Sequence, residues 1–300
     1  MFGRLLLVCA LLVCALLVGA ATALHADDGG ADGQAQWTQR CADNDAWDKA
    51  GPPFRVWGNT WYVGTCGIAA ILIRGTTGDV LIDGGPAGAG DLIAANIEKL
   101  GIGLGDVRIL LHTHEHHDHV GGLARLKQLT GAELYASPFA ARALERGGPN
   151  PEDPQYEEHN ALPAVHVDKV LDGNVTVALG DLKLKGFATP GHTPGAMSWQ
   201  WESCEDGDCR TIVYADSLTP VSSDGYRFSD HPDVVAAFNA SLMTVGSLRC
   251  DILLSPHPSA SGMRDRLVAG SLVAPAACYA YADRLKRQLD ARLAKEANGG

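Results

Sequence analysis

One short stretch of the chain carries four side chains that can bind a metal ion. Residues 110–122 read LLHTHEHHDHVGG, where His114, His116, Asp118 and His119 follow an apolar run in the pattern His-x-His-x-Asp-His. Lone pairs and a carboxylate crowded this closely repel one another unless a cation lies among them. Imidazole with carboxylate suits Zn²⁺ better than Mg²⁺ or Ca²⁺, and few soft sulfur ligands are nearby. The stretch predicts a metal site for zinc, with iron or manganese as the alternatives.

The same stretch falls between two predicted elements. Residues 107–111 are typical of a short buried strand, and residues 120–129 have leucines at helical spacing before Gly131, which predicts a helix that ends there. The histidines therefore lie on a strand-to-helix loop. The first two are two positions apart and can point the same way, while the aspartate and the next histidine can face a second point. One loop could serve two metals.

Two further histidines stand in constrained places. His192 lies in ATPGHTPG and His257 in ILLSPHPS, each after a strand-like run and beside proline or glycine residues that restrict the backbone. Asp216 and Ser217, in IVYADSL, follow a third apolar run. Ligand candidates therefore occur at four strand ends.

These motifs, taken with VLIDGG at residues 80–85, resemble those of the metallo-β-lactamase superfamily over nearly all of the chain that follows the N-terminal segment. The segments PFRVWGNTWYVGT, SWQW, ADSLT and CDILLSPHPSASG are similar to the third subclass of true metallo-β-lactamases, whose second zinc is bound by histidine in place of cysteine. The chain agrees with that pattern, because position 217 is serine and His119 can take the cysteine's place.

The resemblance implies a set of ligands for two zinc ions. The first zinc would be bound by His114, His116 and His192, and the second by Asp118, His119 and His257. The remaining histidines of the mature chain match no family ligand and are interpreted as ordinary polar residues: His112, His117, His159, His166 and His231. Asp83 is predicted to orient the metal loop from behind, or else to form the turn before Gly84 and Gly85.

The implied reaction is hydrolysis of a β-lactam amide by a zinc-bound hydroxide, with Asp118 as the catalytic side chain that holds the second zinc. No covalent acyl-enzyme is needed. By resemblance, Ser217 and Thr219 contact the substrate carboxylate, and Gln155 reaches the substrate from a loop over the site. For these three residues, ordinary surface polarity is the alternative.

The first 26 residues have one arginine, a long apolar run and a small-residue exit, which predicts a cleaved signal peptide and a periplasmic protein. A retained membrane anchor is the alternative; a lipoprotein is disfavoured because valine precedes both Cys9 and Cys14. Cleavage removes one arginine and no acid, so the net charge goes from -11 to -12. That charge disfavours nucleic acid as a partner. We expect residues 27–300 to form one domain, monomeric and without stable membrane association.

Six cysteines follow the predicted leader, and an even number in an exported protein indicates disulfides. Cys204 and Cys209 flank a Glu-Asp-Gly-Asp turn, the geometry of a bridged hairpin. The resemblance implies that Cys250 pairs with Cys278, which leaves Cys41 with Cys66. Six cysteines allow about fifteen pairings, so the connectivity rests largely on resemblance.

Periodicity alone indicates a mixed α/β chain. Strands are predicted at 68–74 and 80–83, and helices at 91–100, 232–246 and 276–294. With the resemblance, this pattern predicts a four-layer αββα sandwich with the metal site at one edge of the two sheets.

Two other functions remain open at this stage. A superfamily hydrolase of the glyoxalase II or lactonase type is the main alternative, because Asp216 could in principle bridge two metals as an aspartate does in glyoxalase II. A zinc-binding protein without catalysis is the third. The predicted leader and the ADSLT and PHPSASG segments favour the β-lactamase.

Overall fold

The computed structural model describes residues 31–42, 46–158 and 161–298. The predicted signal peptide and His159 lie outside these residues. Among the described helices, none combines the length and the apolar character that crossing a membrane requires.

The first sheet has seven strands that lie side by side in chain order. They are β1 (Phe54–Trp57), β2 (Thr60–Tyr62), β3 (Ile71–Ile73), β4 (Asp79–Ile82), β5 (Val107–Leu111), β6 (Glu133–Ala136) and β7 (Lys169–Val170). Strands β1 to β4 are antiparallel, whereas β4 to β7 are parallel. Parallel neighbours require a crossover, and helices supply it between β4 and β6.

The second sheet has five strands in the order β12-β11-β10-β9-β8. They are β8 (Val175–Leu179), β9 (Leu182–Ala188), β10 (Met197–Glu205), β11 (Asp208–Tyr214) and β12 (Ile252–Leu254). Only β11 and β12 pair in parallel; the other neighbours are antiparallel. A long connection that contains a helix joins β11 to β12, and this allows the two strands to run in the same direction.

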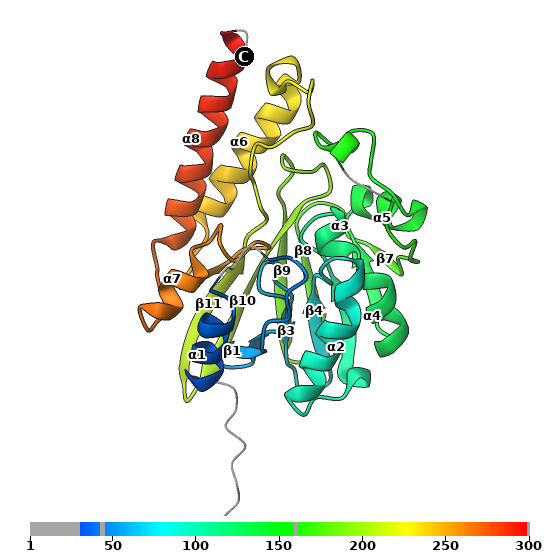
Figure 1. The fold of residues 1–300 in the computed structure, drawn as a ribbon, viewed down its shortest axis with the longest axis vertical. Coiled ribbons are helices and arrows are strands. Elements are labelled where there is room, and N and C mark those ends of the chain that lie inside the picture. Colours follow the sequence, from blue (N-terminus) through cyan, green and yellow to red (C-terminus); the bar gives the residue numbers. More distant parts are fainter. Residues whose placement is uncertain (1–30, 43–45, 159–160, 299–300) are drawn as a thin grey trace, which may run out of the picture.

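Helices cover the outer face of each sheet (Figure 1). Those on the first sheet are α2 (Gly90–Lys99), α4 (Leu123–Thr130) and α5 (Pro138–Arg146). Those on the second are α6 (Pro232–Ser247) and α8 (Ala277–Ala297). Three separate apolar clusters fill the spaces between the four layers, the central one lying between the two sheets. The predicted αββα sandwich is confirmed.

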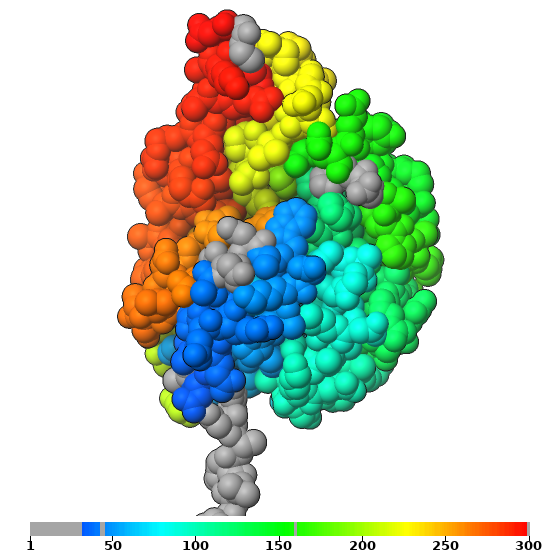
Figure 2. Space-filling model, viewed as in Figure 1, coloured from blue at the N-terminus to red at the C-terminus, as the bar shows by residue number. Residues whose placement is uncertain are grey.

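The N-terminal helix α1 (Ala31–Arg40) lies outside the layers, across one edge of the molecule. It packs beside β1 and α7 (Met263–Val268), so a segment from the start of the described chain lies against one from its last third (Figure 2). Trp37 of α1 is fully buried against Phe54 and Tyr62, with ring centroids 5.7 and 5.6 Å away. The helix thereby closes the lower end of the core between the sheets.

Two predicted elements differ from the structure. The predicted helix at 120–129 is divided into α3 (His117–Val120) and α4, because Gly121 and Gly122 pass against the backbone of another turn. The predicted strand at 68–74 shortens to Ile71–Ile73, because Ile68 closes a turn with Thr65. The expected end of α4 is correct, since Gly131 adopts the left-handed conformation with φ 69°.

The three expected cysteine pairs are adjacent in space. Their sulfur atoms lie within bonding distance in each pair, with Cα atoms 5.2, 4.0 and 6.1 Å apart for Cys41–Cys66, Cys204–Cys209 and Cys250–Cys278. Cys204 lies directly opposite Cys209 in the β10–β11 hairpin, as the turn between them predicts.

Candidate metal centre

All six predicted ligands gather at one edge of the sandwich. They lie in the segments that follow β5, β9 and β12, beyond the carboxyl ends of these strands, with Asp118 and His119 in the short helix α3. Because both sheets present these ends at the same edge, residues up to 143 positions apart, from His114 to His257, meet there. The predicted position of the site is correct.

Three histidines form the first group. The ligand atoms of His114, His116 and His192 all lie within 4.8 Å of one another, and the residues are buried. Each ring is held by a contact on one nitrogen: His114 Nδ1 lies 2.8 Å from Asp216 Oδ1, His116 Nε2 lies 2.9 Å from Asp153 Oδ2, and His192 Nδ1 lies 3.0 Å from the Thr219 carbonyl. A histidine held this way by its outer nitrogen presents the other nitrogen to a metal.

Asp118, His119 and His257 form the second group. Asp118 Oδ2 lies 2.9 Å from His119 Nε2 and 3.4 Å from His257 Nε2, and these two nitrogens are 3.3 Å apart. Around a zinc ion with bonds of about 2.0–2.1 Å, neighbouring ligand atoms of a tetrahedron are separated by about 3.3 Å. The donor set and its spacing therefore fit a tetrahedral metal position.

The protonation states of His114, His192 and Asp118 suit metal binding. Burial lowers the pKa of His192 to about 4 and holds that of His114 well below its ordinary value, so both rings are neutral at pH 7. Although burial opposes its ionisation, His119 and His257 hold the pKa of Asp118 below its ordinary value. In addition, His114 Nε2 is buried with no hydrogen-bond partner among the described residues. Neutral imidazoles and an ionised carboxylate are the ligand forms that bind a metal.

Asp83 lies behind the metal loop, as expected, but it contacts none of the candidate ligands through a hydrogen bond. Its carboxylate accepts hydrogen bonds from the Thr113 amide at 2.7 Å, the Thr113 hydroxyl at 2.9 Å and the Tyr214 hydroxyl at 2.7 Å. Burial raises the pKa of Asp83 to about 6, against the lowering effect of His119 and of these hydrogen bonds. Asp83 thus joins the two sheets and fixes the first residue of the loop.

A backbone contact fixes the other end of the loop. The Gly84 amide donates to the His119 carbonyl at 2.8 Å, and the Gly122 amide donates to the Gly85 carbonyl at 3.0 Å. A Cβ atom on Gly122 would lie 2.2 Å from the Gly84 carbonyl oxygen, and one on Gly121 would lie 2.6 Å from the Ala87 nitrogen. Both distances are too short for any side chain. Glycine at these positions lets the two turns touch, and the helix divides there.

The sequence did not reveal the role of Glu115, in the middle of the metal loop. Its buried carboxylate accepts hydrogen bonds from the Thr193 hydroxyl at 2.7 Å, the Gly195 amide at 3.0 Å and the Asn150 side chain at 3.2 Å. Glu115 therefore ties the metal loop to the loop that carries His192 and to the segment that begins at Asn150. A glutamate in a loop gives no pattern from which such contacts could be predicted.

Asp153 and Asp216 were also missed as partners of histidines. Asp216 contacts Nδ1 of His114 and is fully buried. Asp153 lies two positions before Gln155 and accepts a hydrogen bond from its backbone amide at 2.8 Å. This is a local turn that the EDPQ sequence could have indicated.

The three predicted substrate contacts differ in their surroundings. The Ser217 hydroxyl and the Gln155 amide nitrogen are buried with no hydrogen-bond partner among the described residues. Thr219 instead places its hydroxyl 3.1 Å and its carbonyl 3.0 Å from His192 Nδ1. Thr219 therefore positions a candidate ligand in this structure.

The four described histidines that were predicted to be ordinary polar residues lie outside both groups. His112 is buried and accepts the Ser137 amide at 3.0 Å, His166 contacts Glu145 at 3.0 Å, and His231 stacks on Tyr226. His117 packs beside Trp47, with ring centroids 6.1 Å apart.

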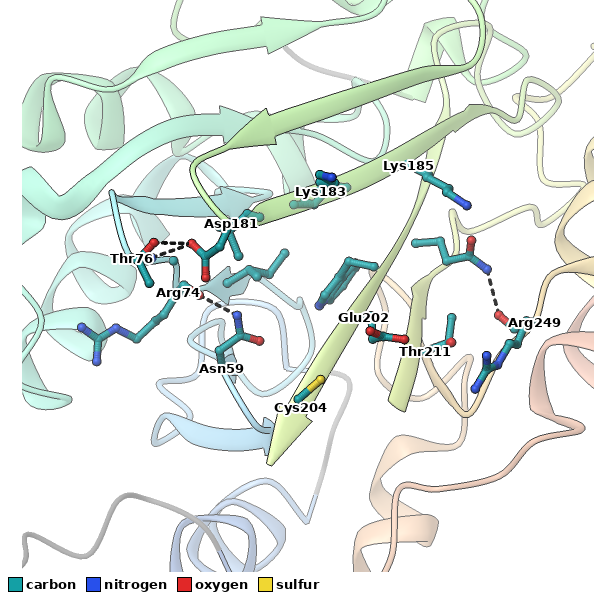
Figure 3. Close-up of a pocket in the computed structure, with 16 residues that line it drawn as sticks. Asn59, Arg74, Thr76, Asp181, Lys183, Lys185, Glu202, Cys204, Thr211 and Arg249 are labelled. Atoms are coloured by element: carbon teal, nitrogen blue, oxygen red, sulfur yellow. Dashed lines mark hydrogen bonds between the residues drawn. The ribbon is translucent and has the colours of Figure 1, made fainter. Parts of the chain in front are cut away.

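A pocket of about 890 Å³ lies elsewhere, over strands β9 to β11 (Figure 3). Charged side chains line it, among them Lys183, Lys185 and Glu202, and none of the six candidate ligands does. Its Thr76–Asp181 and Asn59–Arg74 hydrogen bonds are those of an ordinary solvated surface. The metal centre is therefore the better candidate for the functional site.

Comparison with known proteins places this geometry in a family. The model of the metallo-β-lactamase superfamily matches residues 63–206. Among solved structures, the metallo-β-lactamase MIM-2 is 53% identical, covers 88% of this chain and 98% of its own, and has a TM-score of 0.84. MIM-1 from Novosphingobium pentaromativorans is 46% identical, with coverages of 88% and 99% and a TM-score of 0.86.

A third solved relative carries the subclass in its title. MEM-A1, a subclass B3 metallo-β-lactamase from a soil metagenome library, is 39% identical, with coverages of 85% and 100% and a TM-score of 0.81. The chain therefore belongs to the metallo-β-lactamase superfamily and, within it, to subclass B3.

Curated relatives match more distantly. A probable metallo-hydrolase of Burkholderia pseudomallei is 31% identical over 45% of this chain, and a hydroxyacylglutathione hydrolase of Maricaulis maris is 38% identical over 29%. The match spans 48% and 27% of their respective lengths, about half or less.

Asp83→Ala should lower the free energy of unfolding by at least about 2 kcal/mol, because it removes the carboxylate to which three buried donors bond and each group left unsatisfied costs about 1–3 kcal/mol. Chemical denaturation measures the effect. The control is Asp181→Ala, which removes a similar pair of hydrogen bonds to Thr76 from an exposed site and should cost much less, because water can replace them. Equal losses in the two variants would contradict the role given to Asp83.

Proposed function

We propose that this protein is a zinc-dependent β-lactamase that hydrolyses the amide bond of penicillins, cephalosporins and carbapenems and thereby confers antibiotic resistance. The observation that carries the proposal is the pair of adjacent three-ligand groups at the edge of a fold shared with subclass B3 metallo-β-lactamases. His114, His116 and His192 would hold one zinc ion, and Asp118, His119 and His257 a second.

Two zinc ions, when bound, supply Lewis acidity and lower the pKa of a coordinated water toward neutrality. A site with three protein ligands leaves a zinc coordination position open for water or substrate, as catalytic zinc sites do. The chain supports this arrangement by keeping His114 and His192 neutral and Asp118 ionised. Asp118 is the only carboxylate of the proposed ligand set, so it sets the charge of the second position.

The substrate carboxylate would be bound by groups that now have no partner. The Ser217 hydroxyl and the side-chain amide nitrogen of Gln155 are buried donors without an acceptor among the described residues. Because leaving such groups unsatisfied costs about 1–3 kcal/mol each, a ligand that accepts from them would bind favourably. Thr219, by contrast, would orient His192.

Ser217 is unsuited to act as a nucleophile. A catalytic serine needs a base within hydrogen-bond reach of its hydroxyl, and the Ser217 hydroxyl has no hydrogen-bond partner among the described side chains. This supports direct attack by water without a covalent acyl-enzyme.

The position of Asp216 disfavours the thioesterase alternative. A metal-bridging aspartate would have to face both ligand groups, but Asp216 contacts the nitrogen of His114 that lies opposite the unpartnered Nε2. We therefore expect little hydrolysis of a glutathione thioester, and this substrate is tested beside a carbapenem.

We also propose that the mature protein, residues 27–300, is one periplasmic domain with three disulfides, released by cleavage of the leader. The composition of the leader and the three adjacent cysteine pairs support this. The same reasoning favours a monomer without stable membrane association.

The purified mature protein should hydrolyse a carbapenem and leave a glutathione thioester essentially intact. Spectrophotometric assays of both substrates in parallel measure this. A chelator should abolish hydrolysis and added zinc should restore it, because the reaction depends on the metal. Thioester hydrolysis that exceeds carbapenem hydrolysis would reverse the assignment.

Elemental analysis should find two zinc ions per chain, and His192→Ala and His257→Ala should each retain about one. Both variants should lose about 100- to 1,000-fold in turnover, the usual cost of removing a positioned electrostatic stabiliser. Added zinc should partly restore only His257→Ala, whose side chain is 28% exposed. Wild-type turnover of His257→Ala without added zinc would remove this residue from the ligand set.

Ser217→Ala should raise KM by about tenfold or less and leave kcat nearly unchanged, because one hydrogen bond to the substrate contributes about 1 kcal/mol. The control is Ser203→Ala, a buried serine on β10 that bonds to the Trp57 carbonyl and should not change KM. Loss of kcat at constant KM would indicate a chemical role for Ser217.

Protein recovered from the periplasm of a bacterial host should begin near residue 27 and contain no free thiol after unfolding without reductant. N-terminal sequencing and thiol titration measure these properties. Two or more reactive thiols would show that at least one of the three proposed bridges does not form.

A further inference from the structure

We infer that Asp153 is a positioning residue that couples the first zinc position to the segment 150–158, called here the Asn150 loop. The inference rests on the zinc centre proposed above and deepens it. It explains how one carboxylate can determine both the orientation of a ligand and the position of a residue that faces the substrate.

The carboxylate of Asp153 is shared between two partners. One oxygen lies 2.9 Å from His116 Nε2, and the other accepts a hydrogen bond from the backbone amide of Gln155 at 2.8 Å. The Asp153 side chain is fully buried, so water does not compete for either oxygen. Among the described residues, the contact with His116 is the hydrogen bond that links the Asn150 loop to the ring of a candidate ligand.

The contact selects a tautomer of His116. A neutral imidazole carries its proton on one nitrogen, and a carboxylate acceptor beside Nε2 keeps the proton there. The lone pair is then on Nδ1, the nitrogen that a metal would use. Binding of zinc at Nδ1 makes the Nε2 proton a stronger donor, which tightens the contact with Asp153.

A tighter contact between Asp153 and His116 also affects Gln155, through the turn that Asp153 closes. The Tyr156 amide donates to the Asp153 carbonyl at 3.0 Å, and the Ser223 amide donates to the Pro154 carbonyl at 2.9 Å. Fixing Asp153 therefore also fixes the neighbouring segment at Ser223. Zinc should order this part of the chain although none of its residues is a predicted ligand.

Asn150 provides a comparison within the same loop. It donates to Glu115 at 3.2 Å and to the Phe139 carbonyl at 2.9 Å, and neither partner is a candidate ligand. Asn150 thus anchors the loop without acting on a metal-binding nitrogen.

Replacement of Asp153 by asparagine separates the two contacts. If the amide oxygen accepts from Gln155, its NH₂ group faces His116 Nε2 and favours the tautomer that cannot offer Nδ1. If the oxygen faces His116 instead, the NH₂ group faces the Gln155 amide and the turn is lost. Asparagine has the size of aspartate, so either outcome reflects hydrogen bonding and not packing.

The test measures zinc affinity and backbone exchange in the full mature chain, with zinc alone as the probe. Competition with a chromogenic chelator should show that Asp153→Asn binds the tighter zinc about 10- to 100-fold more weakly, the usual effect of removing an outer partner of a ligating histidine. Hydrogen exchange at residues 153–158 should slow at least tenfold when zinc is added to the wild-type protein, and should not respond to zinc in Asp153→Asn.

Two controls separate coupling from simple anchoring. Asn150→Ala should speed exchange in the loop but keep the wild-type zinc affinity and the response to zinc. Asp79→Asn alters another buried aspartate that accepts a backbone amide, from Gly75, and should change neither quantity.

The inference is overturned if Asp153→Asn binds zinc within twofold of wild type, even with a loosened loop, because Asp153 would then only anchor the loop. It is also overturned if zinc leaves wild-type exchange unchanged, a comparison that needs no variant to fold. Neither measurement uses a β-lactam, so a protein that fails to hydrolyse one can still confirm the coupling.

Discussion

The structure depends on one electrostatic constraint: polar groups that compete for protons are crowded into a buried space. Such a cluster is stable only if each member is held on its far side and a cation neutralises the near side. Asp216, Asp153 and the Thr219 carbonyl hold the three histidines of the first group. The fold can therefore be understood as a means of bringing these outer partners to the same edge.

The two sheets meet this requirement in different ways. The first sheet supplies the metal loop after a buried parallel strand and, from the segment before β7, Asp153. Asp216, Thr219 and the loops that carry His192 and His257 follow strands of the second sheet. Polar contacts cross between the sheets: Trp199 donates to the His112 carbonyl at 2.8 Å, and Tyr214 donates to Asp83 at 2.7 Å. The sheets are thus joined immediately beneath the metal centre, where a change in their spacing would alter ligand geometry most.

Sequence reasoning anticipated that the six candidate ligands lie together, because their spacing and their position at strand ends follow local rules. Strand β5, the end of α4 at Gly131 and the cysteine pair of the β10–β11 hairpin were predictable for the same reason. Contacts between distant segments were not. The division of the helix at Gly121 depends on a turn more than thirty residues earlier, and nothing near Glu115 indicates the three donors that it meets. Thr219 was assigned from a motif, and only its contact with His192 shows how it is used here.

The backbone contact between the Gly84 turn and Gly122 has a consequence for how this molecule could change over time. With no side chain between these two turns, the backbone beneath the site is held directly against the end of the sheet and has little room to move. The segments around Gln155 and Ser223, which border the site, are less constrained. They are loops, and among the described residues one backbone hydrogen bond joins them. New substrate ranges would therefore arise by changes in these loops, while the backbone contact beneath the site stays the same. Substrate preference and chemistry would then depend on separate parts of one chain.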